Sequence, residues 1–86
     1  MADQKAFDTA MGLLKTLPEQ GPDVLLKLYG LYKQATVGDV QGRRPGMLDF
    51  RGQAKHDAWA EFRGQTKQQA IDAYIAFVDE LVKANS

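Results

Sequence analysis

Apolar side chains recur at three- and four-residue spacing along four stretches of the chain, and this period constrains the fold more than any other feature of the sequence. Such spacing is typical of helices that bury one face. It predicts helices over about residues 4–16, 23–36, 52–62 and 66–83. No stretch alternates apolar and polar residues as a half-buried strand does. The sequence therefore predicts an all-α fold.

Helix start and stop signals lie between these segments. Asp3 is the expected N-cap of the first helix, and "LPEQGPD" at 17–23 breaks the chain with proline and glycine before the second. Gly64 is expected to end the third helix. Thr66 and Gln69, in "TKQQ", form the pattern of a capping box, in which each residue satisfies a free backbone N–H of the other.

The connection between the second and third predicted helices is unusually long. It contains fourteen residues, "VGDVQGRRPGMLDF", from Val37 to Phe50. Antiparallel neighbours in a bundle usually need about 2–8 linking residues. A connection of this length can cross the whole length of a small bundle, so we expect the second and third helices to run parallel.

Two features of this connection predict that it is ordered. Pro45-Gly46 suits a type II turn. Met47, Leu48 and Phe50 are apolar, and we expect them to pin the connection onto the bundle. Long ordered loops often carry function.

Composition narrows the possible classes of protein. The 86 residues fit one domain, 1–86, and the absence of cysteine excludes disulfides and thiolate metal sites. Eleven basic and eleven acidic residues cancel, which argues against a nucleic-acid-binding protein. No apolar stretch reaches the roughly 18 residues of a membrane span, and the first twenty residues do not resemble a signal peptide. We therefore expect a cytoplasmic location.

The chain offers little to support catalysis. It lacks the nucleophile elbow G-x-S-x-G, the phosphate loop G-x-x-x-x-G-K-[ST] and the zinc motif H-E-x-x-H. The single histidine, His56, has no ligand pattern around it, so a solvated or packing role is expected. Asp79 and Glu80 lie on the polar face of the last predicted helix. The sequence thus predicts a binding protein and not an enzyme, with no metal site and no catalytic residues.

Basic and aromatic residues cluster around the long connection. Lys33 follows Tyr29 by four residues, so both side chains point from the same face of the second helix. Arg51 and Lys55 are spaced in the same way on the third helix. If the two helices pack side by side, these cations converge on a candidate site for a multiply charged anion such as phosphate. The alternative is that they are solvated surface charges.

The three tyrosines, Tyr29, Tyr32 and Tyr74, combine flat apolar rings with hydroxyl donors. That combination suits a ligand that contains both a heteroaromatic ring and phosphate. The alternative is a position at the rim of the core with the hydroxyl in water. Trp59 is expected to lie in the core. Gly12 and Gly30, inside the first and second helices, are each expected to allow a neighbouring helix to approach closely.

Four segments closely resemble the acyl-coenzyme A binding protein family. They are "YKQATVGD" (32–39), "RPGMLDF" (44–50), "AKHDAW" (54–59) and "AYI" (73–75). The resemblance covers essentially the whole chain, including the spacing of the helices. It implies a four-helix up-down-down-up bundle with a long crossover between the second and third helices.

The resemblance also implies a function. Proteins of this family bind medium- to long-chain fatty acyl-CoA esters, without changing them chemically, and buffer and transport them in the cytoplasm. It implies a monomer that needs no cofactor and makes transient contact with acyl-CoA-using enzymes or membranes. Carried over by position, the family's ligand contacts fall on Lys15, Tyr29, Tyr32, Lys33, Arg51, Lys55 and Tyr74.

The resemblance gives these residues roles. Lys33, Lys55 and a tyrosine hydroxyl would bind the ribose 3′-phosphate of coenzyme A, and aromatic faces would flank the adenine. The acyl chain would lie in an apolar groove lined by side chains such as Met11, Leu25 and Leu28.

The sequence departs from the family in three places. His56 stands where the family usually has tryptophan, and Arg51 where it usually has lysine. The loop between the first two helices, which follows Lys15, is about one residue shorter than in the family. The competing hypotheses are a helical protein-interaction module that contacts an acidic or helical partner, and a nucleotide-dependent enzyme.

Overall fold

The computed structural model describes residues 4–85, which fold into four helices. These are α1 (Gln4–Leu14), α2 (Pro22–Thr36), α3 (Phe50–Ala60) and α4 (Lys67–Ala84). The described residues contain no strand, which confirms the all-α prediction. Asp3, the expected cap of α1, lies outside the described residues. Within this part of the chain, no helix combines the length and apolar character needed to cross a bilayer.

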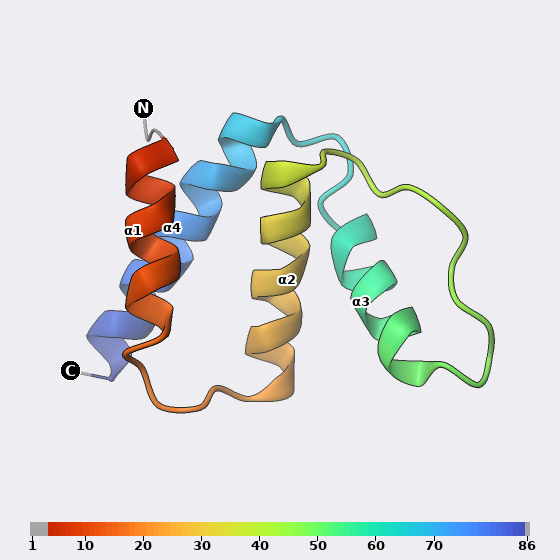
Figure 1. Ribbon diagram of the computed structural model, residues 1–86, viewed down its shortest axis with the longest axis horizontal. Helices are drawn as coiled ribbons and strands as arrows, with labels where there is room; N and C mark the ends of the chain where they lie inside the picture. The colour runs from red at the N-terminus through yellow and green to blue at the C-terminus, as the bar shows by residue number, and fades with distance from the viewer. Residues whose placement is uncertain (1–3, 86) are drawn as a thin grey trace.

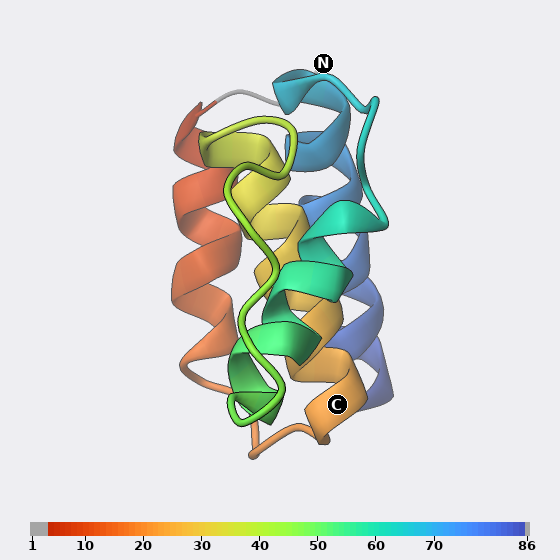
Figure 2. The same ribbon diagram turned by 90° about the vertical axis from the view of Figure 1, so that its right-hand side faces the viewer.

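The helices form the up-down-down-up arrangement (Figure 1). α1 and α4 run in one direction, and α2 and α3 both run in the other. The segment 37–49, which we call the crossover, returns along the length of the bundle to connect the end of α2 to the start of α3 (Figure 2). The prediction that α2 and α3 are parallel is confirmed.

The capping signals set the starts of α3 and α4. The Thr66 hydroxyl accepts a hydrogen bond from the backbone N–H of Gln69 at 3.0 Å, and the Gln69 side chain accepts from the Thr66 N–H at 2.8 Å, so the capping box is present. α3 begins two residues earlier than predicted because the Asp49 carboxylate accepts a hydrogen bond from the Gly52 N–H at 2.9 Å.

The core lies where α4 and α2 meet, with α1 packed on α4 and α3 packed on α2. Apolar side chains at helical spacing fill it, as the periodicity predicted. The buried cluster comprises Phe7, Ala10, Leu28, Leu31, Ala35, Ala70, Tyr74, Val78 and Leu81. Trp59 is also buried, as expected.

Gly30 allows α2 and α3 to approach each other closely. A β-carbon at this position would lie 2.5 Å from the carbonyl oxygen of Ala58 and 2.7 Å from the ring of Phe62. Any larger residue would push the helices apart, which confirms the expectation for Gly30. The expectation was wrong for Gly12, because a β-carbon there would meet nothing within 4 Å.

A buried glutamine ties the start of the crossover to the connection between α3 and α4. Gln34 is fully buried, and its amide donates hydrogen bonds to Asp39 Oδ1 at 2.9 Å and to the carbonyl oxygen of Gln65 at 2.8 Å. Asp39 Oδ1 also accepts from the Gly64 N–H at 2.9 Å. These hydrogen bonds, that from Gly64 above all, hold the pKa of the Asp39 carboxyl below its usual range.

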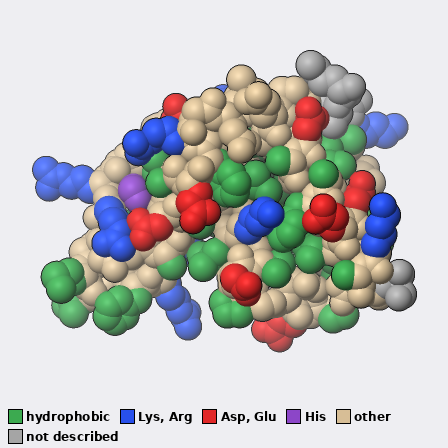
Figure 3. Space-filling view, turned by 180° about the vertical axis from the view of Figure 1, so that it is seen from behind, with side chains coloured by type: hydrophobic (Ala, Val, Ile, Leu, Met, Phe, Trp, Pro, Cys, Tyr) green, Lys and Arg blue, Asp and Glu red, His purple; other side chains and the backbone are tan. Residues whose placement is uncertain are grey.

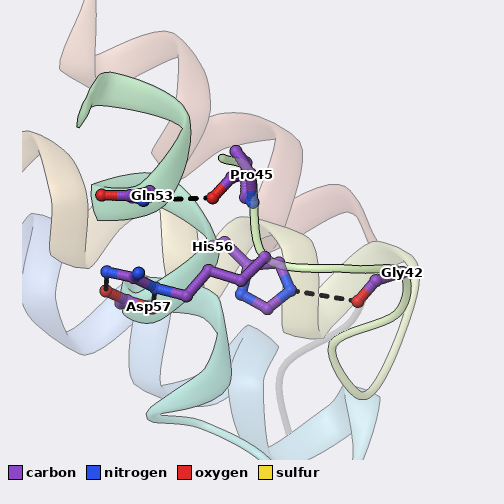
Figure 4. Close-up of polar contacts among 6 residues, drawn as sticks. Gly42, Pro45, Gln53, His56 and Asp57 are labelled. Atoms are coloured by element: carbon purple, nitrogen blue, oxygen red, sulfur yellow. Dashed lines mark hydrogen bonds and ion pairs between the residues drawn. The ribbon is translucent and has the colours of Figure 1, made fainter. Parts of the chain in front are cut away.

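Three polar contacts fasten the middle of the crossover to α3, namely Arg44–Asp57, Gln53–Pro45 and His56–Gly42 (Figure 4). Arg44 donates two hydrogen bonds of 2.9 Å to the two carboxylate oxygens of Asp57. This pair lowers the pKa of Asp57 and raises that of Arg44. His56 lies 3.2 Å from the Gly42 carbonyl oxygen and donates to it when Nε2 carries the proton.

The crossover turns two residues later than predicted. A type II turn at Pro45-Gly46 needs a positive φ at Gly46, and Gly46 is not among the glycines that have one. The turn runs instead from Gly46 to Asp49, whose N–H donates to the Gly46 carbonyl oxygen at 3.0 Å. The predicted type II turn is wrong.

The apolar residues of this turn do not pin the crossover onto the bundle. Met47 is 82% exposed, Leu48 97% and Phe50 76%. The turn closes directly before α3 begins, so these side chains project away from the core. The expectation was wrong because the polar contacts of Figure 4 hold the crossover in place of apolar packing.

Candidate ligand-binding site

The parallel packing of α2 and α3 places two pairs of residues opposite each other. Lys33 Nζ lies 4.8 Å from the centre of the Trp59 ring, and Lys55 Nζ lies 5.4 Å from the centre of the Tyr29 ring. Tyr29 and Lys33 are four residues apart on α2, and so share one face of that helix. Lys55 and Trp59 are related in the same way on α3. The same contacts would not form if the helices ran antiparallel. Lys55 and Arg51 also line one groove between α2 and α3, whereas the convergence of all three predicted cations stays a prediction.

The two ammonium groups lie over aromatic rings and have no carboxylate partner among the described residues. Within residues 4–85, neither Lys33 nor Lys55 takes part in an ion pair. The aromatic faces under them supply only a weak electrostatic attraction, which does not neutralise the charge. This side of the α2–α3 interface is therefore suited to an anion with several negative charges.

A second aromatic group joins α1, α2 and α4. The rings of Phe7 and Tyr32 are stacked, with centres 6.2 Å apart, and Tyr74 meets Phe7 edge-on at 5.0 Å. Tyr32 is 41% exposed, whereas Tyr74 is only 4% exposed. Burial raises the pKa of Tyr74, with a smaller contribution from the nearby Tyr32. Tyr74 thus holds the group from the core side, while Tyr32 presents its ring to solvent.

An apolar groove of about 360 Å³ runs between the first halves of α2 and α3. Its lining consists of Pro22, Leu25, Leu26, Tyr29, Phe50, Arg51, Ala54 and Lys55. Tyr29 and Lys55 belong both to this groove and to the cation cluster, so the apolar groove and the cations form one continuous site. That combination fits a molecule with an anionic head and an apolar tail.

Other predicted residues lie elsewhere. Lys15 is exposed just beyond the end of α1, and within the described residues no side-chain contact joins it to the other predicted site residues. Leu28 is part of the core, Met11 packs against the core, and neither lines the groove. His56 faces the crossover and is not part of the groove lining (Figure 4).

Sequence reasoning missed three contributors to the site. Phe7 positions two tyrosines, and Phe50 and Ala54 line the groove. Ala54 could have been found, because it lies four residues before Ala58 on the face of α3 that meets α2. The contact of Phe7 with Tyr32 depends on how α1 and α2 are placed in space, which no local pattern encodes.

A larger hollow of about 740 Å³ lies between α2, α3 and α4, and none of the predicted ligand residues lines it. Asp23, Asp57 and Glu61 border it. Their carboxylates would repel an anion, so the smaller groove, which Arg51 and Lys55 line, is better suited to an anionic ligand. The described residues contain no cluster of histidine and carboxylate side chains that could hold a metal ion.

Comparison with known proteins identifies the family. The family model described as "Acyl CoA binding protein" matches residues 4–78. The chain is 49% identical over 78 residues to acyl-CoA-binding protein homolog 1 of Caenorhabditis elegans, covering 90% of this chain and 91% of that protein.

Solved structures agree with this match over nearly the full chain. The crystal structure of Oryza sativa acyl-CoA-binding protein 2 superposes with a TM-score of 0.90 at 40% identity, covering 94% of this chain and 91% of that one. The acyl-CoA binding protein of Moniliophthora perniciosa gives a TM-score of 0.89 at 38% identity, covering 99% and 85%. The chain belongs to the acyl-CoA binding protein family.

Proposed function

We propose that this protein binds medium- to long-chain fatty acyl-CoA esters, one per monomer, and that it buffers and transports them in the cytoplasm without changing them chemically. One observation carries the proposal. The lining of the apolar groove between α2 and α3 includes two cations, Arg51 and Lys55, that form no ion pair within the described residues. An acyl-CoA ester is an amphiphile with that distribution of charge.

The cations bind the nucleotide end of the ligand. Coenzyme A carries a ribose 3′-phosphate and a diphosphate, roughly −4 in total at neutral pH. We assign the 3′-phosphate to Lys33 and Lys55, with the Tyr29 hydroxyl as a further donor. Charge-assisted hydrogen bonds of this kind are worth about 1.5–3 kcal/mol each.

The tyrosine group binds the adenine. The exposed Tyr32 ring, supported from beneath by Phe7 and Tyr74, offers a flat face on which a heteroaromatic ring can stack. Burial of Tyr74 keeps its phenol neutral at physiological pH, since its pKa is raised from a value that is already high. A neutral phenol does not repel the phosphates.

The groove binds the acyl chain. Leu25 is 51% exposed and lines the groove, so its side chain is available to cover a bound tail. Arg51 also lines the groove and supplies a third positive charge, which attracts the negatively charged ligand. Removal of the tail from water supplies affinity in proportion to its length, up to about 0.8 kcal/mol per methylene.

The alternative function is a helical protein-interaction module that contacts an acidic or helical partner. The same lysines and tyrosines would serve it. Membership of a family of acyl-CoA binding proteins does not favour it. A nucleotide-dependent enzyme is also not favoured, because the family is one of binding proteins.

Isothermal calorimetry across a series of acyl lengths tests the proposal. Affinity should rise steeply from acetyl-CoA to palmitoyl-CoA and flatten once the groove is filled, with one ligand per chain. Free coenzyme A should bind far more weakly, and recovered ligand should be chemically intact. Equal affinity for the acetyl and palmitoyl esters would mean that the tail is not buried, and turnover of the thioester would indicate an enzyme.

A further inference from the structure

Three large apolar side chains project from the crossover where it enters α3. Met47 is 82% exposed, Leu48 97% and Phe50 76%, and we call these three residues the apolar tip. Figure 3 shows hydrophobic side chains protruding at the corner of the molecule where α3 begins. Exposed apolar residues that gather at one point mark an interaction surface more often than isolated ones do.

The apolar tip is held in place by hydrogen bonds. The Asp49 N–H donates to the Gly46 carbonyl oxygen at 3.0 Å, and the Asp49 carboxylate accepts from the Gly52 N–H at 2.9 Å. The double hydrogen bond between Arg44 and Asp57 fixes the crossover just before the turn. The tip is thus a preformed protrusion, and its burial against a partner would cost little ordering entropy.

Cations surround the tip. Residues 43–57 contain four basic and two acidic side chains, although the whole chain is electrically neutral. One acid, Asp57, is paired with Arg44, and the other, Asp49, accepts a hydrogen bond from the backbone of α3. Within the described residues, Arg43 and Arg51 take part in no ion pair. Both are exposed.

The tip is continuous with the ligand groove. Phe50 belongs to the tip and also lines the groove, next to Arg51. Leu25 lies in the same groove and is 51% exposed. This end of the groove therefore adjoins the apolar tip through Phe50.

We propose that the apolar tip inserts into the surface of a membrane that contains anionic lipid, with Arg43 and Arg51 against the lipid headgroups. A convex apolar protrusion flanked by cations fits a deformable bilayer, in which the acyl region receives the side chains and the headgroups receive the charge. The contact would let an acyl chain move between groove and bilayer without crossing water. Only this transfer step rests on the proposed function, because insertion itself needs no ligand.

Vesicle sedimentation with ligand-free protein tests the insertion. Wild-type protein is compared with the double variant Met47→Ser/Leu48→Ser on vesicles of phosphatidylcholine with and without phosphatidylglycerol. The control is Leu13→Ser, which removes an apolar side chain that is 38% exposed on α1. Circular dichroism establishes that each variant is folded, and the exposure of Met47 and Leu48 predicts an unchanged melting temperature for the double variant.

We expect the wild type and the control to bind the anionic vesicles, and the double variant to bind at least about tenfold more weakly, since two large side chains no longer leave water. Vesicles without phosphatidylglycerol should bind the wild type more weakly. Equal binding by wild type and double variant, or equal binding to both kinds of vesicle, would overturn the proposal.

Two further measurements exclude other occupants of the tip. If palmitoyl-CoA affinity in solution, without vesicles, fell in the double variant, the tip would contact the ligand and the proposal would be overturned. If sedimentation equilibrium showed a wild-type dimer that the double variant abolished, a second copy would cover the tip, which would also overturn it.

A protein that bound anionic vesicles through the tip but failed to bind palmitoyl-CoA would refute the proposed function alone.

Discussion

Gly30 of α2 packs directly against the backbone of Ala58 in α3, so closely that a β-carbon on Gly30 would lie 2.5 Å from the Ala58 carbonyl oxygen. This contact sets the separation of the two parallel helices. The same separation brings Lys33 to the Trp59 ring and Lys55 to the Tyr29 ring. The ligand site thus depends on a glycine that carries no functional group.

Replacement of this glycine should destabilise the protein. In Gly30→Ala, the gain in helix propensity of about 1 kcal/mol is opposed by overpacking, which typically costs about 1–3 kcal/mol. We expect a net loss in the free energy of unfolding, measured by urea denaturation. The matched control is Gly12→Ala in α1, where a β-carbon would meet nothing within 4 Å. That variant should be as stable as the wild type or more so, and equal effects at both sites would contradict the assigned role of Gly30.

Removal of one phosphate-binding lysine should weaken ligand binding without unfolding the protein. Lys33→Ala should reduce palmitoyl-CoA affinity by about tenfold or more, because a charge-assisted contact is worth about 1.5–3 kcal/mol. The loss should be much smaller with the palmitoyl ester of dephospho-CoA, which lacks the 3′-phosphate. Calorimetry with both ligands measures the difference.

The chain offers a matched control for this variant. Lys27 lies on the same helix and its Nζ is 4.3 Å from the centre of the Phe77 ring, outside the proposed site. Lys27→Ala removes a similar cation–π contact and the same charge. Its affinity for palmitoyl-CoA should stay within about twofold of the wild type, since surface charges at a distance are screened by salt. A tenfold loss there would show that long-range charge, and not contact with the phosphate, explains the effect of Lys33.

Removal of a groove side chain should affect the acyl chain and not the nucleotide. Leu25→Ala removes apolar surface that lines the groove and is half-exposed without ligand. Palmitoyl-CoA should bind about 1–2 kcal/mol more weakly, whereas free coenzyme A should bind equally well. Competition with a fluorescent acyl-CoA reports both affinities. An equal loss for the two ligands would place Leu25 at the nucleotide end.

Acid should weaken the tether at the start of the crossover. Asp39 has a folded-state pKa below its ordinary value of 3.8, so the unfolded state binds more protons in that range and stability rises with pH. The contribution of Asp39 is therefore present above its unfolded pKa and is lost as the pH falls through the lower folded pKa. In Asp39→Asn, the free energy of unfolding should depend less steeply on pH between about pH 5 and pH 1. Urea titrations at each pH would measure the slope, and parallel curves for the two proteins would contradict this role.

Local patterns predicted the helices well because helix formation is read from neighbouring residues. The Thr66–Gln69 capping box appears as expected, and the length of the connection from Val37 to Phe50 correctly indicated that α2 and α3 run parallel. A chain of that length has few other ways to connect two packed helices.

Sequence reasoning failed where a residue's role depends on a partner from another element. Met47 and Leu48 are apolar, but hydrophobic character alone does not say whether a surface is available to receive them. The sequence does not indicate a partner for Arg44, yet the carboxylate of Asp57, thirteen residues later, accepts two hydrogen bonds from it. Helix spacing predicted the face of its own helix on which each lysine lies. Which ring of the other helix lies under each lysine depends on the register between α2 and α3.

The pairing of α1 with α4 has a consequence during synthesis on the ribosome. α1 packs along α4, yet its last residue, Leu14, is made 70 residues before Ala84 at the end of α4. At about 5–20 residues per second, the helix that is made first waits on the order of 4–14 s for the helix that covers it. Phe7, almost fully buried in the finished protein, has no Tyr74 ring to contact until 67 further residues have been made. A nascent chain arrested before α4 emerges should therefore present the apolar face of α1 to chaperones.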